Sequence, residues 1–359
     1  MQNLSAGLGL PLRPQPTARK ARSKPDNGDG IRLNLSFQPP YDWHTIIRFY
    51  QSHPIPGIER VAENSFERVF RIENTIGLLR VEAIVGEPQL RVRIVTKDAK
   101  ILFEVASRVR KMFDLDSDPM LIANSLARVP LLARLCGRFP GLRLPRGWDA
   151  FETAICSILG QLVSAEQRSN LVGQLVRGYG EEIAHPISRE KTYLFPGPDI
   201  LAQSDLGKVK TTIARREAIR EFSRRVLSGA ISLSEPQDPA SFRKALLETK
   251  GIGPWSAEYI SLRAIGDTDA FPRTDLILKR VLELHPDLNL EVVKPWRSYA
   301  AIYLWKGFAQ MLSRRKRRNA HDTLLQRDGI SGRQTQIGGK RESAGRRSLG
   351  TGTPRPSKA

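Results

Sequence analysis

The stretch that decides the fold is Leu246-Leu247-Glu248-Thr249-Lys250-Gly251-Ile252-Gly253-Pro254-Trp255-Ser256-Ala257. It predicts a helix that ends, a tight Gly-Ile-Gly turn, and a second helix that begins at Pro254. Glycine tolerates positive φ angles and lets another backbone approach closely, and proline suits the first turn of a helix. Backbone N–H groups around such a turn can face an anion. A bare Gly-x-Gly usually marks only a tight turn, but the whole pattern favours a hairpin that holds an anion such as a phosphate.

One aspartate follows the predicted hairpin at the start of another helix. Asp275 lies 22 residues beyond Gly253, and the apolar residues Leu276, Ile277 and Leu278 come directly after it. A carboxylate at this place is most often an ordinary helix cap. Asp275 alone therefore does not indicate catalysis, and it becomes a catalytic candidate only because the predicted hairpin precedes it.

In the region around the hairpin, apolar residues recur with the spacing that is typical of short helices. Apolar residues at three- and four-residue spacing predict helices near 151–162, 213–226 and 254–264, from about residue 274, and over 295–308. In this pattern Leu162 shares a helix face with Phe151, Ile155, Ile158 and Leu159. We expect an all-helical domain over residues 146–313.

In the region before the helical domain, apolar residues recur with the two-residue spacing of β-strands. Apolar and polar residues alternate over 66–73, 79–85 and 90–94, between breaks at glycine, asparagine and proline, which is typical of antiparallel strands. Leu102, Val105, Val109 and Met112 then predict a helix. Residues 31–145 are therefore expected to form an antiparallel sheet with helices, and the chain belongs to the α+β class.

The charge is strongly positive and unevenly placed. The net charge is +20 over 359 residues. Counting Lys and Arg against Asp and Glu gives +3 for residues 1–30 and +10 for 314–359, which leaves +7 for the rest. We expect a disordered basic arm over 1–30 and a disordered basic tail over 314–359. An anionic polymer is the expected partner, and nucleic acid fits better than a membrane, although the tail could also be a passive solubiliser.

Composition excludes several classes of protein. No apolar run approaches the roughly 18 residues that a membrane helix needs, and the N-terminal residues do not have the pattern of a signal peptide. Two cysteines are too few for a disulfide framework, a zinc ribbon or a four-cysteine iron–sulfur cluster. The five histidines have no ligand spacing. We expect a protein of a reducing compartment.

Several segments beyond the hairpin resemble one family. They are Phe37-Gln38-Pro39-Pro40-Tyr41-Asp42-Trp43, Pro140-Gly141-Leu142-Arg143-Leu144-Pro145, Ile158-Leu159-Gly160-Gln161-Leu162-Val163-Ser164, Gly251 to Tyr259, and Lys294-Pro295-Trp296-Arg297-Ser298-Tyr299-Ala300. In order and spacing, over about residues 33–312, the chain resembles the bacterial 3-methyladenine DNA glycosylases II (AlkA-type) of the helix-hairpin-helix superfamily. The resemblance implies an N-terminal antiparallel sheet, then two helical parts with a cleft between them.

The resemblance also implies an activity and a site. The activity is hydrolysis of the N-glycosidic bond of alkylated bases in double-stranded DNA, by a monomer that requires no cofactor. The location implied is the bacterial cytoplasm, in association with the nucleoid. Asp275 would be the catalytic carboxylate. The base pocket would be lined by Trp255, Tyr259, Trp305 and Phe49, and the DNA would be contacted by Leu162, Gln161, Gly251, Ile252 and Gly253, with Leu162 as the wedge. A monovalent cation, Na⁺ or K⁺, would be held by the carbonyls of Leu247, Thr249 and Ile252.

The residue types suit this chemistry. Glycosylases flip the target base out of the duplex, and an apolar side chain such as Leu162 can fill the gap. Aromatic faces attract the positive charge of an alkylated purine, and a carboxylate stabilises the oxocarbenium character of the sugar. Trp255 stands where the related lyases have a Schiff-base lysine, so we expect a monofunctional enzyme.

Two other functions remain open at this point. One is a glycosylase for oxidised or deaminated bases, and the other is a DNA-binding module that has lost catalysis. The chain also departs from the family at Arg273-Thr274, where another acidic residue is common before the aspartate.

Overall fold

The computed structural model describes residues 30–233 and 238–312. The chain divides into two compact units, one ending at Tyr303 and one beginning at Leu304. The predicted arm and tail fall almost entirely outside the described residues. Within the described ranges, no helix is both long and apolar enough to cross a membrane.

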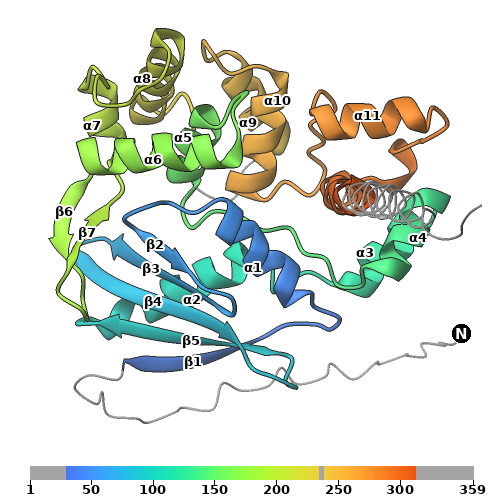
Figure 1. Ribbon diagram of the computed structural model, residues 1–359, viewed down its shortest axis with the longest axis horizontal. Helices are drawn as coiled ribbons and strands as arrows, with labels where there is room; N and C mark the ends of the chain where they lie inside the picture. The colour runs from blue at the N-terminus through green and yellow to red at the C-terminus, as the bar shows by residue number, and fades with distance from the viewer. Residues whose placement is uncertain (1–29, 234–237, 313–359) are drawn as a thin grey trace, which may run out of the picture. The chain divides into compact units, whose positions relative to one another are not determined.

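The N-terminal part of the first unit is built on an antiparallel sheet (Figure 1). Its strands are β1 (Ile31–Ser36), β2 (Glu59–Val61), β3 (Ser65–Ile72), β4 (Thr75–Ala83) and β5 (Gln89–Thr96). They pair in the order β1-β5-β4-β3-β2. The helices α1 (Trp43–Ser52) and α2 (Leu102–Met112) share one apolar core with this sheet. The predicted α+β class is therefore confirmed.

The rest of the unit is mostly helical. Its helices are α3 (Pro119–Leu126), α4 (Pro130–Arg138), α5 (Ala150–Leu159), α6 (Ala165–Tyr179), α7 (Pro198–Gln203), α8 (Ile213–Leu227), α9 (Pro239–Leu247), α10 (Pro254–Ile260) and α11 (Leu276–Leu284). Short 3-10 turns cover η1 (Ala99–Ile101) and η3 (Glu291–Val293), and η2 (Ser261–Ile265) is a π-helical turn. Residues 297–312 are also helical, about two residues later than expected at the start and four at the end.

Side-chain caps fix where several of these helices begin. Asp149 accepts hydrogen bonds from the N–H groups of Phe151 and Glu152 at 2.9 and 3.1 Å, which starts α5. Asp118 and Asp238 cap α3 and α9 in the same way, each followed by proline in the first turn. Such caps satisfy N–H groups that a helix leaves without partners.

Two sequence expectations are wrong in this region. Residues 146–313 are not all helical, because β6 (Glu181–Ala184) and β7 (Lys191–Leu194) form a second, two-stranded sheet. Leu162 does not belong to the apolar face of α5, because that helix ends at Leu159 and the Leu162 side chain is 98% exposed. The core behind α5 is instead made by residues such as Ile155, Ile158 and Phe222.

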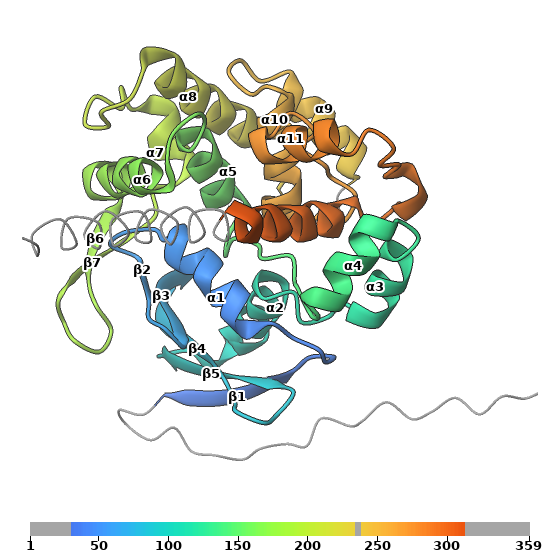
Figure 2. The ribbon, with the colours of Figure 1, turned by 45° about the vertical axis from the view of Figure 1, so that its right-hand side comes forward.

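A buried ion-pair network joins the sheet to α5. The Arg68 guanidinium, 2% exposed, lies 2.9 Å from Glu59 and 2.9 Å from Glu152. Arg68 also lies over the ring of Trp148, 5.2 Å from its centre. Figure 2 shows α1 beside the sheet and below α5 and α6. The network fixes the sheet against the helix that precedes the Leu162 turn.

Candidate active site and DNA interface

The predicted hairpin is present between α9 and α10. The Ile252 N–H donates to the Thr249 carbonyl at 3.0 Å, and Ile252 itself is buried. Gly251 has a φ of +90°, and a Cβ built there would lie 2.5 Å from the Ala218 Cβ of α8. Both its conformation and its close contact therefore require glycine. Pro254 opens α10, as the sequence predicts.

A glutamine ties the hairpin to the turn that carries Leu162. The Gln161 Nε2 donates to the Gly251 carbonyl at 3.0 Å and to the Ser256 hydroxyl at 2.8 Å. The carbonyl of Gln161 accepts a bond from Arg215 at 2.5 Å. Three contacts thus hold the residue that precedes Leu162.

Leu162 is held in an unusual and exposed conformation. Its φ is +54°, in a region that residues other than glycine seldom occupy. Such strain persists only where the surroundings impose it, and the contacts of Gln161 supply that constraint. A large apolar side chain is therefore presented to solvent from a fixed turn beside the hairpin.

Asp275 is both a helix cap and a neighbour of the aromatic residues. Its Oδ1 accepts bonds from the N–H groups of Ile277 and Leu278 at 3.0 and 3.2 Å, which starts α11. Its Oδ2 accepts a bond from the Trp255 indole Nε1 at 3.2 Å. The two readings of the sequence, structural cap and active carboxylate, are therefore compatible, because the cap uses one oxygen and turns the other toward Trp255.

A series of contacts between aromatic rings and one guanidinium group begins at Trp255, the residue bonded to Asp275. Trp255 and Tyr259, one helical turn apart on α10, stack with ring centres 5.0 Å apart and an angle of 11° between planes. The Arg263 guanidinium lies 5.4 Å from the Tyr259 ring centre and 4.4 Å from that of Phe49 on α1. His53 also stacks on Phe49, with ring centres 4.6 Å apart.

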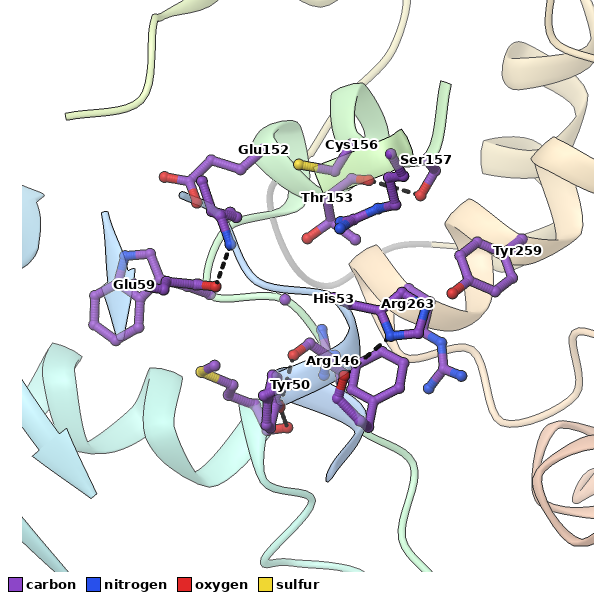
Figure 3. A pocket seen from close by; sticks show the side chains of 16 residues that line it. Tyr50, His53, Glu59, Arg146, Glu152, Thr153, Cys156, Ser157, Tyr259 and Arg263 are labelled. Carbon is purple, nitrogen blue, oxygen red and sulfur yellow. Dashed lines mark hydrogen bonds between the residues drawn. The ribbon is translucent and has the colours of Figure 1, made fainter. Parts of the chain in front are cut away.

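A cavity lies at this meeting of α1, α5 and α10 (Figure 3). Phe49, His53, Tyr259 and Arg263 line it together with residues of α5 such as Cys156. Its free volume of about 60 Å³ is enough for a few water molecules. Burial, with the positive charges of Arg168 and Arg263, lowers the pKa of His53 to about 4. The cavity therefore favours a neutral imidazole.

Residues 32–149 match the model of the AlkA N-terminal domain. The chain is 31% identical to a protein of Mycobacterium tuberculosis named "Probable bifunctional transcriptional activator/DNA repair enzyme AlkA", over 81% of this chain and 61% of that protein. It is 29% identical to the DNA-3-methyladenine glycosylase 2 of Escherichia coli K12, over 76% of this chain and 95% of that protein.

Residues 32–149 form an AlkA N-terminal domain, and over most of its length the chain is similar to AlkA-type proteins. It spans about three fifths of the length of the mycobacterial relatives and nearly all of the E. coli one. A solved 3-methyladenine DNA glycosylase from Archaeoglobus fulgidus has the same fold, with a TM-score of 0.63, 19% identity, and coverage of 76% of this chain and 96% of that one.

The structure brings together most of the residues predicted for an AlkA-family site. Asp275 accepts a hydrogen bond from Trp255, and Trp255 stacks on Tyr259. Phe49 joins this group because the Arg263 guanidinium lies against both Phe49 and Tyr259. Gln161, Gly251, Ile252 and Gly253 meet at the hairpin. Trp305 belongs to the second unit, and its place in a base pocket stays a prediction, as do the roles of the others.

The predicted cation ligands lie on the hairpin. Leu247 is the last residue of α9, and Thr249 and Ile252 follow in the turn. Their backbone carbonyls are neutral oxygen donors, which suit a hard cation, and a carbonyl that already accepts one bond keeps a second lone pair. The donor set fits a monovalent cation. Among the described residues no cluster of His, Cys, Asp or Glu could hold a metal ion.

Sequence reasoning missed Arg263. It is 5% exposed, and its guanidinium donates to the Pro145 carbonyl at 2.8 Å. The signal was present, because Arg263 is a charged residue inside the apolar run Ile260-Ser261-Leu262-Arg263-Ala264-Ile265, four residues after Tyr259. A buried charge in such a run needs a partner, and this one is placed by the π-helical turn η2.

Proposed function

We propose that this chain is a monofunctional DNA glycosylase that hydrolyses the N-glycosidic bond of alkylated bases in double-stranded DNA and so begins base excision repair. The substrates are of the 3-methyladenine and 7-methylguanine type, and the enzyme acts as a monomer. The observation that carries the proposal is the bond between Trp255 and Asp275. It places a carboxylate oxygen at the edge of an aromatic stack, beside a hairpin suited to a DNA phosphate.

The hairpin and the Leu162 turn bind and open the duplex. The hairpin holds one strand through its backbone, because N–H groups near a helix start attract phosphate. Leu162 enters the stack where the damaged base leaves, and its exposed, fixed conformation means that little order has to be gained on binding. Gln161 transmits the position of the hairpin to this wedge. A flipped base then comes within reach of α10.

The aromatic faces select for charge, and Asp275 supports bond cleavage. Trp255 and Tyr259 attract a cationic alkylated purine by about 0.5–2 kcal/mol. The base is already a good leaving group, so the enzyme mainly stabilises the positive charge that develops on the sugar. The Asp275 oxygen that faces Trp255 provides this stabilisation and orients the attacking water.

The carbonyls of Leu247, Thr249 and Ile252 would hold a monovalent cation, which would add positive charge near the bound phosphate. The residues of the turn itself, above all Gly251, shape the phosphate site.

The absence of lyase activity follows from the residue at the start of α10. Trp255 has no amine and cannot form a Schiff base with the sugar. Lys250, the lysine in the turn, is exposed and lies before Gly251. Hydrolysis by water therefore ends the reaction and leaves an abasic site.

A lesion panel tests the proposal. Duplexes that each carry one modified base are incubated with the full chain, and released bases are identified by mass. We expect 3-methyladenine and 7-methylguanine, no strand cleavage, and no covalent complex after borohydride reduction. Asp275→Asn is the matched control.

Each other outcome has a definite meaning. Release of only oxidised or deaminated bases would assign the chain to another lesion class. A trapped complex would contradict the monofunctional mechanism, and binding without release of any base would leave a DNA-binding module.

A further inference from the structure

One arginine reaches the cavity around Phe49 and Tyr259 from α6. Arg168 lies near the start of that helix, and its side-chain stem crosses the end of α5, because a Cβ built on Gly160 would lie 3.2 Å from the Arg168 Cδ. Arg168 lines the cavity together with His53 and Tyr259. A guanidinium from a third helix therefore meets the aromatic group at this cavity.

The described residues around Arg168 do not satisfy its guanidinium. Its Nη1 is buried and has no hydrogen-bond partner among the described residues. The two carboxylates that line the cavity, those of Glu59 and Glu152, are each bonded to Arg68 at 2.9 Å. Buried polar groups nearly always have a partner, and a buried charged donor that lacks one costs free energy. An acceptor that entered the cavity would remove this cost.

The charge of Arg168 acts on two other groups that line the cavity. Burial, and after it the positive charge of Arg168, lowers the pKa of His53 to about 4. Burial raises the pKa of the Cys156 thiol to about 12, and the charge of Arg168 opposes this rise. Both groups are therefore neutral at pH 7, and neither supplies a negative charge to the guanidinium.

The aromatic series connects the candidate catalytic carboxylate with this cavity. Asp275 accepts a bond from Trp255, Trp255 stacks on Tyr259, and Tyr259 lines the cavity. In the proposed function the glycosidic bond lies near Asp275, so a purine on these aromatic faces points its six-membered ring toward the cavity. The free volume of about 60 Å³ holds only a few water molecules. It therefore has room for an exocyclic group of the base and not for the whole base.

We propose that Arg168 donates a hydrogen bond to the keto oxygen at C6 of a flipped purine and so favours guanine-type over adenine-type lesions. The inference rests on the proposed function, because it needs an alkylated base in this site. Guanine carries an acceptor, O6, where adenine carries an amino donor. A guanidinium has donors only, so it pairs with O6 and cannot pair with the amino group. A site with a buried polar group rejects a ligand that leaves that group unpaired.

A comparison between methylated purines separates this bond from the effect of charge. In DNA, 7-methylguanine, 3-methylguanine and 3-methyladenine all carry positive charge, so the charge of Arg168 opposes all three. Only the two guanine-type bases have the O6 acceptor. The ratio of guanine-type to adenine-type bases released therefore reports the hydrogen bond, whereas the total release also reports the charge.

The test uses duplex DNA methylated with dimethyl sulfate, which carries all three lesions in one substrate. The full chain and its variants act on the same DNA, and the bases released at early times are quantified by mass. Arg168→Met removes the charge and the donors and keeps an unbranched stem. The matched control is Arg177→Met, at an exposed arginine of the same helix. Melting curves show whether each variant is folded.

We expect Arg168→Met to lower the ratio of the two guanine-type bases to 3-methyladenine by about tenfold, equivalent to about 1.4 kcal/mol. Arg177→Met should keep the wild-type ratio. The melting temperature of Arg168→Met should not fall, because a buried donor without a partner is lost. If Arg168→Met does not fold, Arg168→Gln takes its place, and its ratio should also fall because its shorter side chain cannot reach O6.

Two results would overturn the proposal and leave the proposed function intact. An unchanged ratio in the folded variant would mean that water in the cavity satisfies the guanidinium. An equal fall in the release of all three bases would mean that Arg168 acts on DNA binding or on packing. Release of no alkylated base by wild type would instead reject the proposed function, and this role of Arg168 with it.

Discussion

The indole N–H of Trp255 and the Oδ2 of Asp275 are 3.2 Å apart, while the Oδ1 of the same carboxylate caps α11. One aspartate thus joins two helices: α10, which carries the aromatic stack, and α11, whose first N–H groups it satisfies. A side chain held at both oxygens has little freedom, and a fixed carboxylate costs no reorganisation when charge develops nearby.

Asp275→Asn is expected to abolish base release and to leave DNA binding intact or tighter. Asparagine is as good a helix cap as aspartate, so α11 should keep its start, while the negative charge near the phosphates is lost. Single-turnover rates and melting curves check this. Retention of more than about a tenth of the wild-type rate, equivalent to about 1.4 kcal/mol of barrier, would show that Asp275 is not the reacting carboxylate. Asp275→Ala should in addition lower stability by about 1 kcal/mol, because the cap is lost.

Leu162→Ala is expected to lower the rate on duplex DNA without loss of stability. The side chain is 98% exposed, so truncation removes no core contact, and the strained φ of +54° is no worse for alanine than for leucine. Melting temperature and single-turnover rate are measured side by side. A large fall in melting temperature would assign Leu162 to the core, and an unchanged rate would mean that it is not the wedge.

The prediction that Leu162 lies on the apolar face of α5 was wrong, and the reason shows what sequence periodicity cannot detect. The spacing of Leu162 from Ile158 and Leu159 fits a helix face, yet α5 ends before Gly160, and Leu162 follows in a turn with its side chain exposed. The family resemblance assigned a wedge role to the same residue. Periodicity finds elements of regular structure well, but it cannot locate the residue at which a helix stops.

Other parts of the site differ in how far sequence could predict them. The hairpin and Asp275 are local patterns with strong backbone causes, and both are in place. The four-residue strands β6 and β7 carry too short a pattern to detect, and β7 is explained by its contact with the main sheet. Arg263 depends on rings from α1 and α10, far apart in the chain, so only the three-dimensional fold reveals its partners.

Arg263→Gln should increase the preference for cationic over neutral bases. The Arg263 guanidinium lies against Tyr259, and a positive charge there disfavours a second positive charge on the same aromatic group. Removing it should raise the ratio of 7-methylguanine release to hypoxanthine release by roughly tenfold, or about 1.4 kcal/mol. Arg263→Lys, which keeps the charge, is the matched control and should leave the ratio near that of wild type. An equal change in both variants would mean that Arg263 acts through packing.

His53 should make the fold less stable in acid. Its pKa in the folded protein is about 4, below the ordinary value of about 6.5. The unfolded chain therefore binds a proton first as the pH falls. The contribution of a neutral His53 is fully present above pH 6.5 and is lost between pH 6.5 and 4, and it amounts to at most about 3 kcal/mol.

His53→Gln removes this titration, so its free energy of unfolding should fall less steeply over that range. Denaturant titrations of wild type and variant at pH 7, 6, 5 and 4 measure the two curves. His285→Gln, at an exposed histidine after α11, is the control and should follow wild type. Parallel curves for wild type and His53→Gln would show that His53 is not the titrating group.

Removal of residues 314–359 should weaken non-specific DNA binding without changing which bases are released. These residues lie outside the described structure, and the prediction rests on their charge alone: they carry +10 of the net +20 and contain no Phe, Trp or Tyr that could stack on a base. We expect them to act through phosphates, and each neutralised phosphate releases counterions. The plot of log affinity against log salt should therefore be shallower for the truncated chain, while the lesion profile at saturating enzyme stays the same. An unchanged slope would identify the tail as a passive solubiliser. A changed lesion profile would contradict the assignment of specificity to Trp255, Tyr259 and the residues predicted beside them, because the tail would then take part in choosing the base.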